Sequence, residues 1–206
     1  MKIYEISHET VMSTKYVEFK IDEESPWIKE LLFRSEYETK HDLPIPLYTK
    51  NKLKPNDYPY SAEAHIISKK FLDVIKNLNS DFEALESVVF YKGKNLKAYC
   101  EQSGNADGRI WENFYTMIFP DFKLFNWEKS IYTPKVSRVT GERIVTGLEK
   151  LVLDKNKINE NEAALNKNNI FILNEKRINL LCTENAKLTI EEAELTGIKF
   201  EEVEVM

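Results

Sequence analysis

The 206-residue sequence predicts a single globular α+β domain, built on a mixed or mostly antiparallel sheet with a few short helices. Short apolar runs of strand type recur along the whole chain, whereas stretches with helical periodicity are few and short. Hydrophobic residues make up 42% of the chain, which is enough to cover a core. The low content of glycine and proline argues against disorder. The length suits one such core, although a boundary near residue 60 would separate an N-terminal part (1–60) from a main core (61–206).

Charge and composition narrow the classes of partner and the cellular location. The net charge of -5 argues against non-specific binding to nucleic acid or anionic membranes, because the field of the protein repels phosphate. Charged residues interrupt the first twenty positions, and no later stretch is apolar and long enough to span a membrane. Cys100 and Cys182 are too few for a disulfide framework. We therefore expect a cytoplasmic protein with reduced thiols.

The N-terminal third predicts two strands, a short helix and an extended connector. The strands are expected at Ile3–Ile6 and Tyr16–Ile21, and the helix at Pro26–Arg34. Prolines between residues 44 and 59 alternate with leucines and tyrosines, a pattern that suits neither a long helix nor a central strand. The segment is expected to pack over the core, and a tyrosine-rich binding surface is the alternative.

The middle of the chain predicts one capped helix among several short strands. Ser68 is a good N-cap, and apolar residues follow with helical period to an end near Asn79. The remaining elements are strands at Val88–Tyr91 and Leu96–Cys100, a loop at 103–108, strands at Trp111–Phe119 and Phe122–Phe125, a strand or helix at Leu148–Leu153, and a polar loop at Asn156–Asn169. Trp111–Phe119 is expected at the centre of the core because it is rich in aromatic residues.

The last forty residues predict strand, helix and strand. Strands at Ile170–Leu173 and Ile178–Cys182 lead to Thr183, which should cap a helix that Gly197 ends. In the final strand the apolar alternation changes parity across Glu201–Glu202, which predicts a bulge or bend there.

The two predicted helix starts share one pattern. Each has an apolar pair, a hydroxyl cap, and apolar residues three, seven and ten positions later: Phe71, Ile75 and Leu78 after Ser68, and Ala186, Ile190 and Ala193 after Thr183. An internal repeat would explain this, but so would two independent amphipathic helices that each follow a strand.

The sequence predicts no catalytic, cofactor-binding or metal-binding residues, and hence no enzyme. His65 and Ser68 are the only close base and nucleophile, and Ser68 is better explained as the helix cap. The loop at 103–108 lacks the Lys-Ser/Thr of a phosphate-binding loop and the terminal Glu of a calcium loop. The three histidines and two cysteines do not have metal-ligand spacing.

Acidic residues near the C-terminus are the candidate partner-binding site. The candidates are Glu191, Glu194, Glu201, Glu202 and Glu204, with Glu201 and Glu202 first because the predicted bend would re-aim them. Such a patch would steer a basic protein partner, and the alternative is a solvated face without a partner.

A further pattern is spread along the chain: the start Lys2–Ile6, the segments Ile66–Phe71, Asn126–Tyr132, Ile170–Phe171 and Thr183–Ala186, and a C-terminal Leu-Thr-Gly-Ile-x-Phe-x-x-Val pattern at Leu195–Val203. These segments resemble a bacterial family that was once of unknown function and is now classed among immunity proteins of polymorphic toxin systems. The resemblance spans most of the chain and implies a cytoplasmic protein that binds and neutralises the active domain of a cognate secreted toxin in the producing cell. It brings no catalytic motif.

Two other classes of function stay open at this point. One is a scaffold or adaptor, which a homo-oligomer with a large apolar interface would support. The other is an enzyme whose active site lies beside the proline- and tyrosine-rich connector at residues 44–59. A pocket that holds His65 or Asp107 with a shifted pKa would support it.

Overall fold

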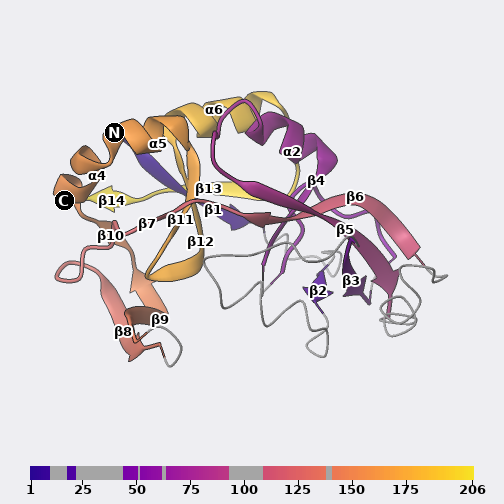
Figure 1. The fold of residues 1–206 in the computed structure, drawn as a ribbon, viewed down its shortest axis with the longest axis horizontal. Helices are drawn as coiled ribbons and strands as arrows, with labels where there is room; N and C mark the ends of the chain where they lie inside the picture. The colour runs from indigo at the N-terminus through magenta and orange to yellow at the C-terminus, as the bar shows by residue number, and fades with distance from the viewer. Residues whose placement is uncertain (10–17, 22–43, 51, 62–63, 93–108, 138–140) are drawn as a thin grey trace.

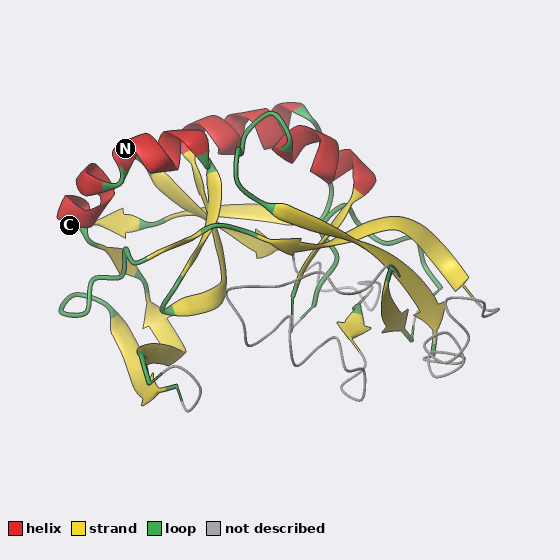
Figure 2. Ribbon diagram, in the orientation of Figure 1, coloured by secondary structure: helices red, strands yellow, loops and turns green. Residues whose placement is uncertain are grey.

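The computed structural model describes residues 1–9, 18–21, 44–50, 52–61, 64–92, 109–137 and 141–206. These residues form two five-stranded sheets, two two-stranded ribbons and four helices, and most strand pairs are antiparallel (Figure 2). The predicted α+β class is confirmed.

The first sheet is organised around the N-terminal strand. Its order is β13 (Ile198–Glu202), β1 (Ile3–His8), β12 (Lys176–Thr183), β11 (Ile170–Leu173) and β7 (Asp121–Phe122). β1 pairs antiparallel with both neighbours, so Ile6 lies opposite Leu180 on one side and Phe200 on the other. Only the short β11–β7 pair in this sheet is parallel.

The second sheet takes its strands from the middle of the chain and from residues 20–49. Its order is β2 (Lys20–Ile21), β3 (Ile45–Thr49), β5 (Glu83–Tyr91), β6 (Arg109–Ile118) and β4 (His65–Ser68). Strands from the first 60 residues thus belong to both sheets. A boundary near residue 60 would cut β1 from β12 and β3 from β5, so 1–60 is not a separate unit.

Two ribbons complete the strands. β8 (Ile131–Val136) and β9 (Arg143–Lys150) form an antiparallel hairpin that projects from the body of the protein (Figure 1). β10 (Val152–Leu153) pairs in parallel with β14 (Glu204–Val205). The ambiguous segment Leu148–Leu153 is therefore strand, divided between β9 and β10.

The helices run along the top of the molecule in the view of Figure 1. They are α2 (Lys69–Ile75), α4 (Lys155–Glu160), α5 (Glu162–Lys167) and α6 (Glu184–Glu192). The segment 156–169 was predicted as a loop with at most one helical turn, and it instead contains most of α4 and all of α5. Asp154 caps α4 by accepting a hydrogen bond from the Asn156 amide at 2.9 Å. α4 buries only Ile158 and α5 buries only Leu165, so neither helix shows a clear apolar period among its polar residues.

The pattern shared by the two capped helices extends to the strands around them. In one unit β4, α2 and β5 are consecutive in the chain. β4 and β5 run parallel to each other, and β6 lies between them in the sheet. In the other, β12, α6 and β13 follow one another, with β1 between them. Ser68 and Thr183 have almost the same cap geometry, with ψ angles of 165° and 166°. The common strand order favours the repeat interpretation.

Each of these helices is tied at its start to the end of the other. Asp57 Oδ1 accepts from the Ser68 hydroxyl at 2.6 Å, and its Oδ2 accepts from the Thr196 amide, beyond α6, at 2.9 Å. In the reciprocal position, Asn169 Oδ1 accepts from the Thr183 hydroxyl at 2.7 Å while its Nδ2 donates to the carbonyl of Leu78, beyond α2, at 2.9 Å. The two units are therefore joined by matched polar bridges.

The first sheet lies between two buried clusters. Tyr4, Ile6 and Leu180 on one face pack with α2, α6 and second-sheet residues. Ile3 and Leu181 on the other face pack with α4, α5 and the base of the hairpin. A third cluster covers the far side of the second sheet. β6 confirms the strand predicted at Trp111–Phe119, and it contributes to the first and third of these clusters.

The proline- and tyrosine-rich segment between residues 44 and 59 was predicted to contain no central strand, and this prediction is wrong for its first part. Residues 45–49 form β3, which lies between β2 and β5 with Pro46 buried. β2 pairs only with Leu47 and Tyr48, so the described residues place no partner strand beside Pro46 on that side. The predicted helix at 26–34, the strand at 96–100 and the loop at 103–108 lie outside the described residues.

The C-terminal stretch follows its predicted plan with two differences. α6 ends at Glu192 rather than at Gly197, and Glu194 takes the left-handed conformation with φ of 50°. Gly197 has φ of 80° beyond the helix. The last strand stays in register with β1 through Glu202 and then takes β10 as its partner. The described pairs show no bulge at Glu201–Glu202. Phe200 packs in the first cluster and Val203 in the second, so the change of parity reflects apolar side chains on the two opposite faces of the sheet.

Candidate functional site

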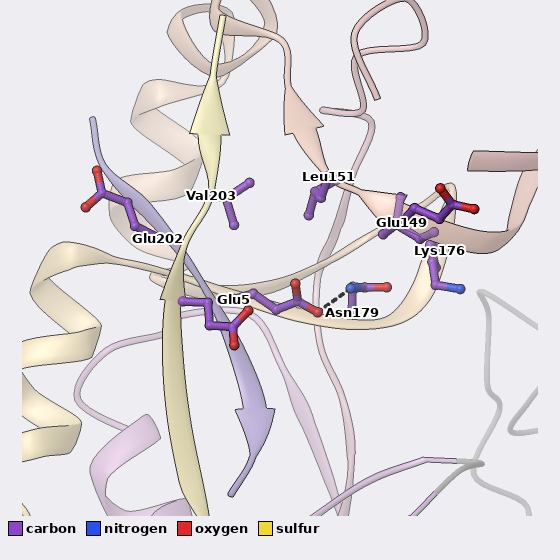
Figure 3. Close-up of a pocket in the computed structure, with 9 residues that line it drawn as sticks. Glu5, Glu149, Leu151, Lys176, Asn179, Glu202 and Val203 are labelled. Atoms are coloured by element: carbon purple, nitrogen blue, oxygen red, sulfur yellow. Dashed lines mark hydrogen bonds between the residues drawn. The ribbon is translucent and has the colours of Figure 1, made fainter. Parts of the chain in front are cut away.

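A polar pocket opens where the second apolar cluster ends on the first sheet (Figure 3). Glu5 lies opposite Leu181 of that cluster, so its side chain continues the same face of the sheet. The pocket has a volume of about 270 Å³. Its lining consists of acidic Glu5, Glu149, Glu201 and Glu202, apolar Leu148, Leu151 and Val203, and the polar pair Lys176 and Asn179.

Two glutamates oppose each other at this pocket. Glu5 on β1 is the direct cross-strand partner of Glu201 on β13. Like charges in this arrangement destabilise a sheet. Burial raises the pKa of the Glu5 carboxyl, the Asn179 hydrogen bond lowers it, Glu201 raises it further, and Lys176 lowers it, with a net increase. Glu5 is thus held in an environment that disfavours its charge.

Asn179 supplies a hydrogen bond and keeps an unused acceptor. Its Nδ2 donates to Glu5 Oε1 (Figure 3). The residue is only 7% exposed, and within the described part of the chain its carbonyl oxygen Oδ1 has no hydrogen-bond partner. A buried acceptor without a partner costs about 1–3 kcal/mol. Because this oxygen has almost no accessible surface, a ligand donor in the pocket reaches it only after a local movement of the surrounding side chains.

The remaining walls are apolar and carry one cation. Val203 and Leu151 face each other across the pocket, while Glu202 points to the other side of its strand (Figure 3). This agrees with the register, which places Glu202 opposite Tyr4 on the other face of the sheet. Lys176 donates from Nζ to the Thr146 carbonyl at 3.1 Å and so joins β12 to β9.

The structure does not gather the five predicted glutamates into one patch. Glu201 lines the pocket, whereas Glu191 lies on α6, which packs on the opposite face of the sheet. Glu191 and Glu204 pair with Lys187 and Lys150 at 2.8 and 2.6 Å, and Glu201 pairs with Lys199. The Glu194 carbonyl accepts from Lys70 at 3.0 Å. Exposed pairs like these contribute little energy, but they reduce the local negative field.

The histidine considered for catalysis is used to join the two sheets. His65 Nε2 lies 3.0 Å from the Arg177 carbonyl, and Nδ1 lies 3.0 Å from the Tyr58 hydroxyl. A carbonyl only accepts, so Nε2 carries the proton and Nδ1 accepts from Tyr58. Burial lowers the pKa of His65 to about 4, which keeps the ring neutral. Both ring nitrogens are therefore engaged within the fold.

Ser68 and Cys182 also have structural roles. The Ser68 hydroxyl donates to Asp57 at 2.6 Å and accepts from the Phe71 amide at 3.2 Å, as its predicted capping role requires. Cys182 is fully buried in the cluster under α6, as predicted, and burial raises the pKa of its thiol. Within the described ranges, no three His, Cys, Asp or Glu side chains are grouped to hold a metal ion.

Sequence reasoning singled out Glu201 but missed its two closest functional neighbours. Glu5 and Asn179 are 174 residues apart in the chain. Each is nevertheless a polar residue inside an apolar strand, Ile3–Ile6 or Ile178–Cys182. That interruption of an apolar run was the available signal.

Comparison of the chain with models of known protein families finds no match, and comparison with curated proteins finds none either. The resemblance to the immunity family stays a prediction. Among the helices in the described part of the chain, none has the length and apolar character needed to cross a membrane.

Proposed function

We propose that this protein is an immunity protein, which binds and neutralises the active domain of a cognate toxin in the cytoplasm of the producing bacterium. The proposal starts from the resemblance at Lys2–Ile6, Ile66–Phe71, Asn126–Tyr132 and Leu195–Val203. Much of this resemblance falls on residues that build the two strand-helix-strand units.

The observation that carries the proposal is the unpartnered Asn179 carbonyl in an acidic pocket that contains Glu201. A folded protein rarely leaves a buried acceptor without a donor. A donor on another molecule would remove that cost when it bound. Glu201, which the sequence predicted as a partner-binding residue, lines the same pocket as the Asn179 carbonyl.

The polar groups considered for catalysis support binding rather than chemistry. His65 is neutral with both nitrogens bonded, Ser68 is bonded on both sides of its hydroxyl, and Cys182 is buried among apolar side chains. Each of these groups would have to break a structural contact in order to react.

Co-expression with the toxin encoded by the adjacent gene tests the proposal. We expect the wild-type protein to restore growth and to elute with the toxin domain as one complex from a sizing column. Glu201→Lys should weaken both effects, whereas Glu192→Lys, on the exposed side of α6, makes the same charge change away from the pocket. No rescue and no complex with the wild-type protein would rule the proposal out.

A further inference from the structure

We propose that the pocket beside Glu5 and Asn179 receives the side chain of an arginine from the partner protein. This inference rests on the proposed function, and it names the chemical group that the site would recognise. The argument combines one unused acceptor, the sign of the surrounding charge, and the shape of the walls.

The unused acceptor defines what the ligand must supply. Asn179 uses its Nδ2 to donate to Glu5, which fixes its amide so that Oδ1 faces away from that carboxylate (Figure 3). Oδ1 is buried and has no partner among the described residues. A carboxylate can accept about four hydrogen bonds, so Glu5 has capacity beyond the one from Asn179. The ligand is therefore expected to bring several donors.

The acidic residues that line the pocket favour a positively charged ligand. Glu5 and Glu201 face each other across the β1–β13 ladder, and Glu149 lines the opposite wall. The one basic residue in the lining is Lys176, and its Nζ donates to the Thr146 carbonyl at 3.1 Å. Lys199 pairs with Glu201 at the surface, where both side chains are more than half exposed, so this pair is weak and can be displaced.

Shape and size favour a single long side chain with a flat charged end. Leu148, Leu151 and Val203 provide an apolar wall against which methylene groups can lie. The volume of about 270 Å³ is below the roughly 300–1,000 Å³ of pockets for drug-sized ligands. Guanidinium carries five donors in one plane and is more weakly hydrated than ammonium, so arginine suits acceptors on separate side chains better than lysine.

The test uses the full-length ¹⁵N-labelled protein and N-acetyl-arginine methylamide as the probe. We expect chemical-shift changes in the Asn179 side-chain amide and in β1 and β13, saturating with a dissociation constant on the order of millimolar, as suits a fragment of this size. The matched citrulline compound has the same shape without the charge, and the matched lysine compound has the charge without the planar donors. Neither should saturate in the same range.

Two variants connect the binding to the pocket. Glu5→Gln and Glu201→Gln should each weaken the probe about tenfold, the effect of losing one charge-assisted hydrogen bond. Glu192→Gln, on the surface of α6, should leave the affinity unchanged. If Glu5→Gln does not fold, the exposed Glu201 variant decides. Equal binding by citrulline or lysine, displacement of the probe by equimolar Mg²⁺, or unchanged affinity in the pocket variants would overturn the inference.

Failure of this inference can be told from failure of the proposed function. A toxin complex that forms and protects cells while the arginine probe does not bind would remove the pocket assignment alone. Probe binding without any toxin complex or rescue would remove the immunity function alone, leaving a site for an arginine side chain with another partner.

Discussion

Asn179 donates a hydrogen bond to the carboxylate of Glu5 and keeps its own buried carbonyl oxygen without a partner. The two residues lie on adjacent antiparallel strands, β12 and β1, and share the face of the sheet that also carries Glu201. The arrangement costs the free protein stability, since one acceptor is unsatisfied and two carboxylates oppose each other. A partner that supplies a positively charged donor would relieve both costs together.

The first prediction concerns that cost. Asn179→Leu removes the donor to the half-buried Glu5 carboxylate, a loss of about 1–3 kcal/mol, and the simultaneous removal of the unsatisfied Asn179 acceptor offsets part of that loss. The double variant Glu5→Met/Asn179→Leu should regain most of that loss, since no buried polar group then lacks a partner. Urea unfolding of both variants and the wild type measures the difference. A double variant as unstable as Asn179→Leu would contradict this view of the pocket.

The second prediction concerns acid. His65 has a folded pKa of about 4 against an ordinary histidine pKa of 6.5, so the unfolded chain binds more protons between these values. Stability should therefore fall as the pH drops from 6.5 to 4, by up to about 3 kcal/mol from this residue. His8, whose pKa is also lowered by burial, acts in the same direction. Glu5 and Glu175, whose pKa values burial raises, act in the opposite direction.

His65→Gln separates the histidine from these other groups. Its amide can still donate to the Arg177 carbonyl and accept from Tyr58, but it does not titrate. Thermal melting between pH 4 and pH 7 should show a smaller loss of stability on acidification in this variant than in the wild type. Parallel profiles for the two proteins would show that His65 is not the titrating group.

The third prediction concerns the bridge between the repeated units. Asp57 accepts from Ser68 at the start of α2 and from the Thr196 amide and hydroxyl beyond α6. Asp57→Ala should cost about 1–3 kcal/mol, because it removes a charged acceptor from three donors. A double-mutant cycle with Thr196→Val should give a coupling of about 1 kcal/mol. Additive effects of the two substitutions in urea unfolding would mean that Asp57 and Thr196 are not energetically coupled.

The fourth prediction compares two glycines with positive φ. Gly197 has φ of 80°, and a Cβ there would lie 2.6 Å from the Cβ of Asn56. Gly141 has φ of 71° with nothing within 4 Å of the same position. Gly141→Ala should cost only the backbone penalty, about 1–2 kcal/mol, and Gly197→Ala should cost more. The gap in unfolding free energy should shrink when Asn56→Gly is added to Gly197→Ala, and equal costs at the two sites would contradict the steric argument.

Local signals in the sequence predicted much of the fold. Ser68 and Thr183 were identified as caps because a hydroxyl before an apolar helical period has a short-range cause. The bulge or bend predicted at Glu201–Glu202 was not found, because the strand keeps its register with β1 and buries apolar side chains first on one face and then on the other. α4 and α5 were missed because each buries one large apolar residue among asparagines and charged residues, which leaves too little periodicity to detect.

The candidate site was far less predictable. Its pocket depends on strand register, which places Glu5 opposite Glu201 and brings Asn179 beside it from 174 residues away. Counting acidic residues suggested one patch, but the sheet separates Glu191 on α6 from Glu201 in the pocket. Composition cannot distinguish these two faces, because the faces exist only once β1 lies between β12 and β13.

The most direct test of the central claim is the rate at which the toxin domain associates with the wild-type protein and with Glu201→Lys/Glu202→Lys. Glu128→Lys/Glu192→Lys, at two exposed positions, makes the same change in net charge and serves as the control. We predict an association rate about tenfold lower for the pocket variant at low salt, with a near-normal rate for the control and a thermal stability no lower than that of the wild type in both. Equal association rates for the wild type and the pocket variant would contradict the claim that the toxin binds at this acidic pocket.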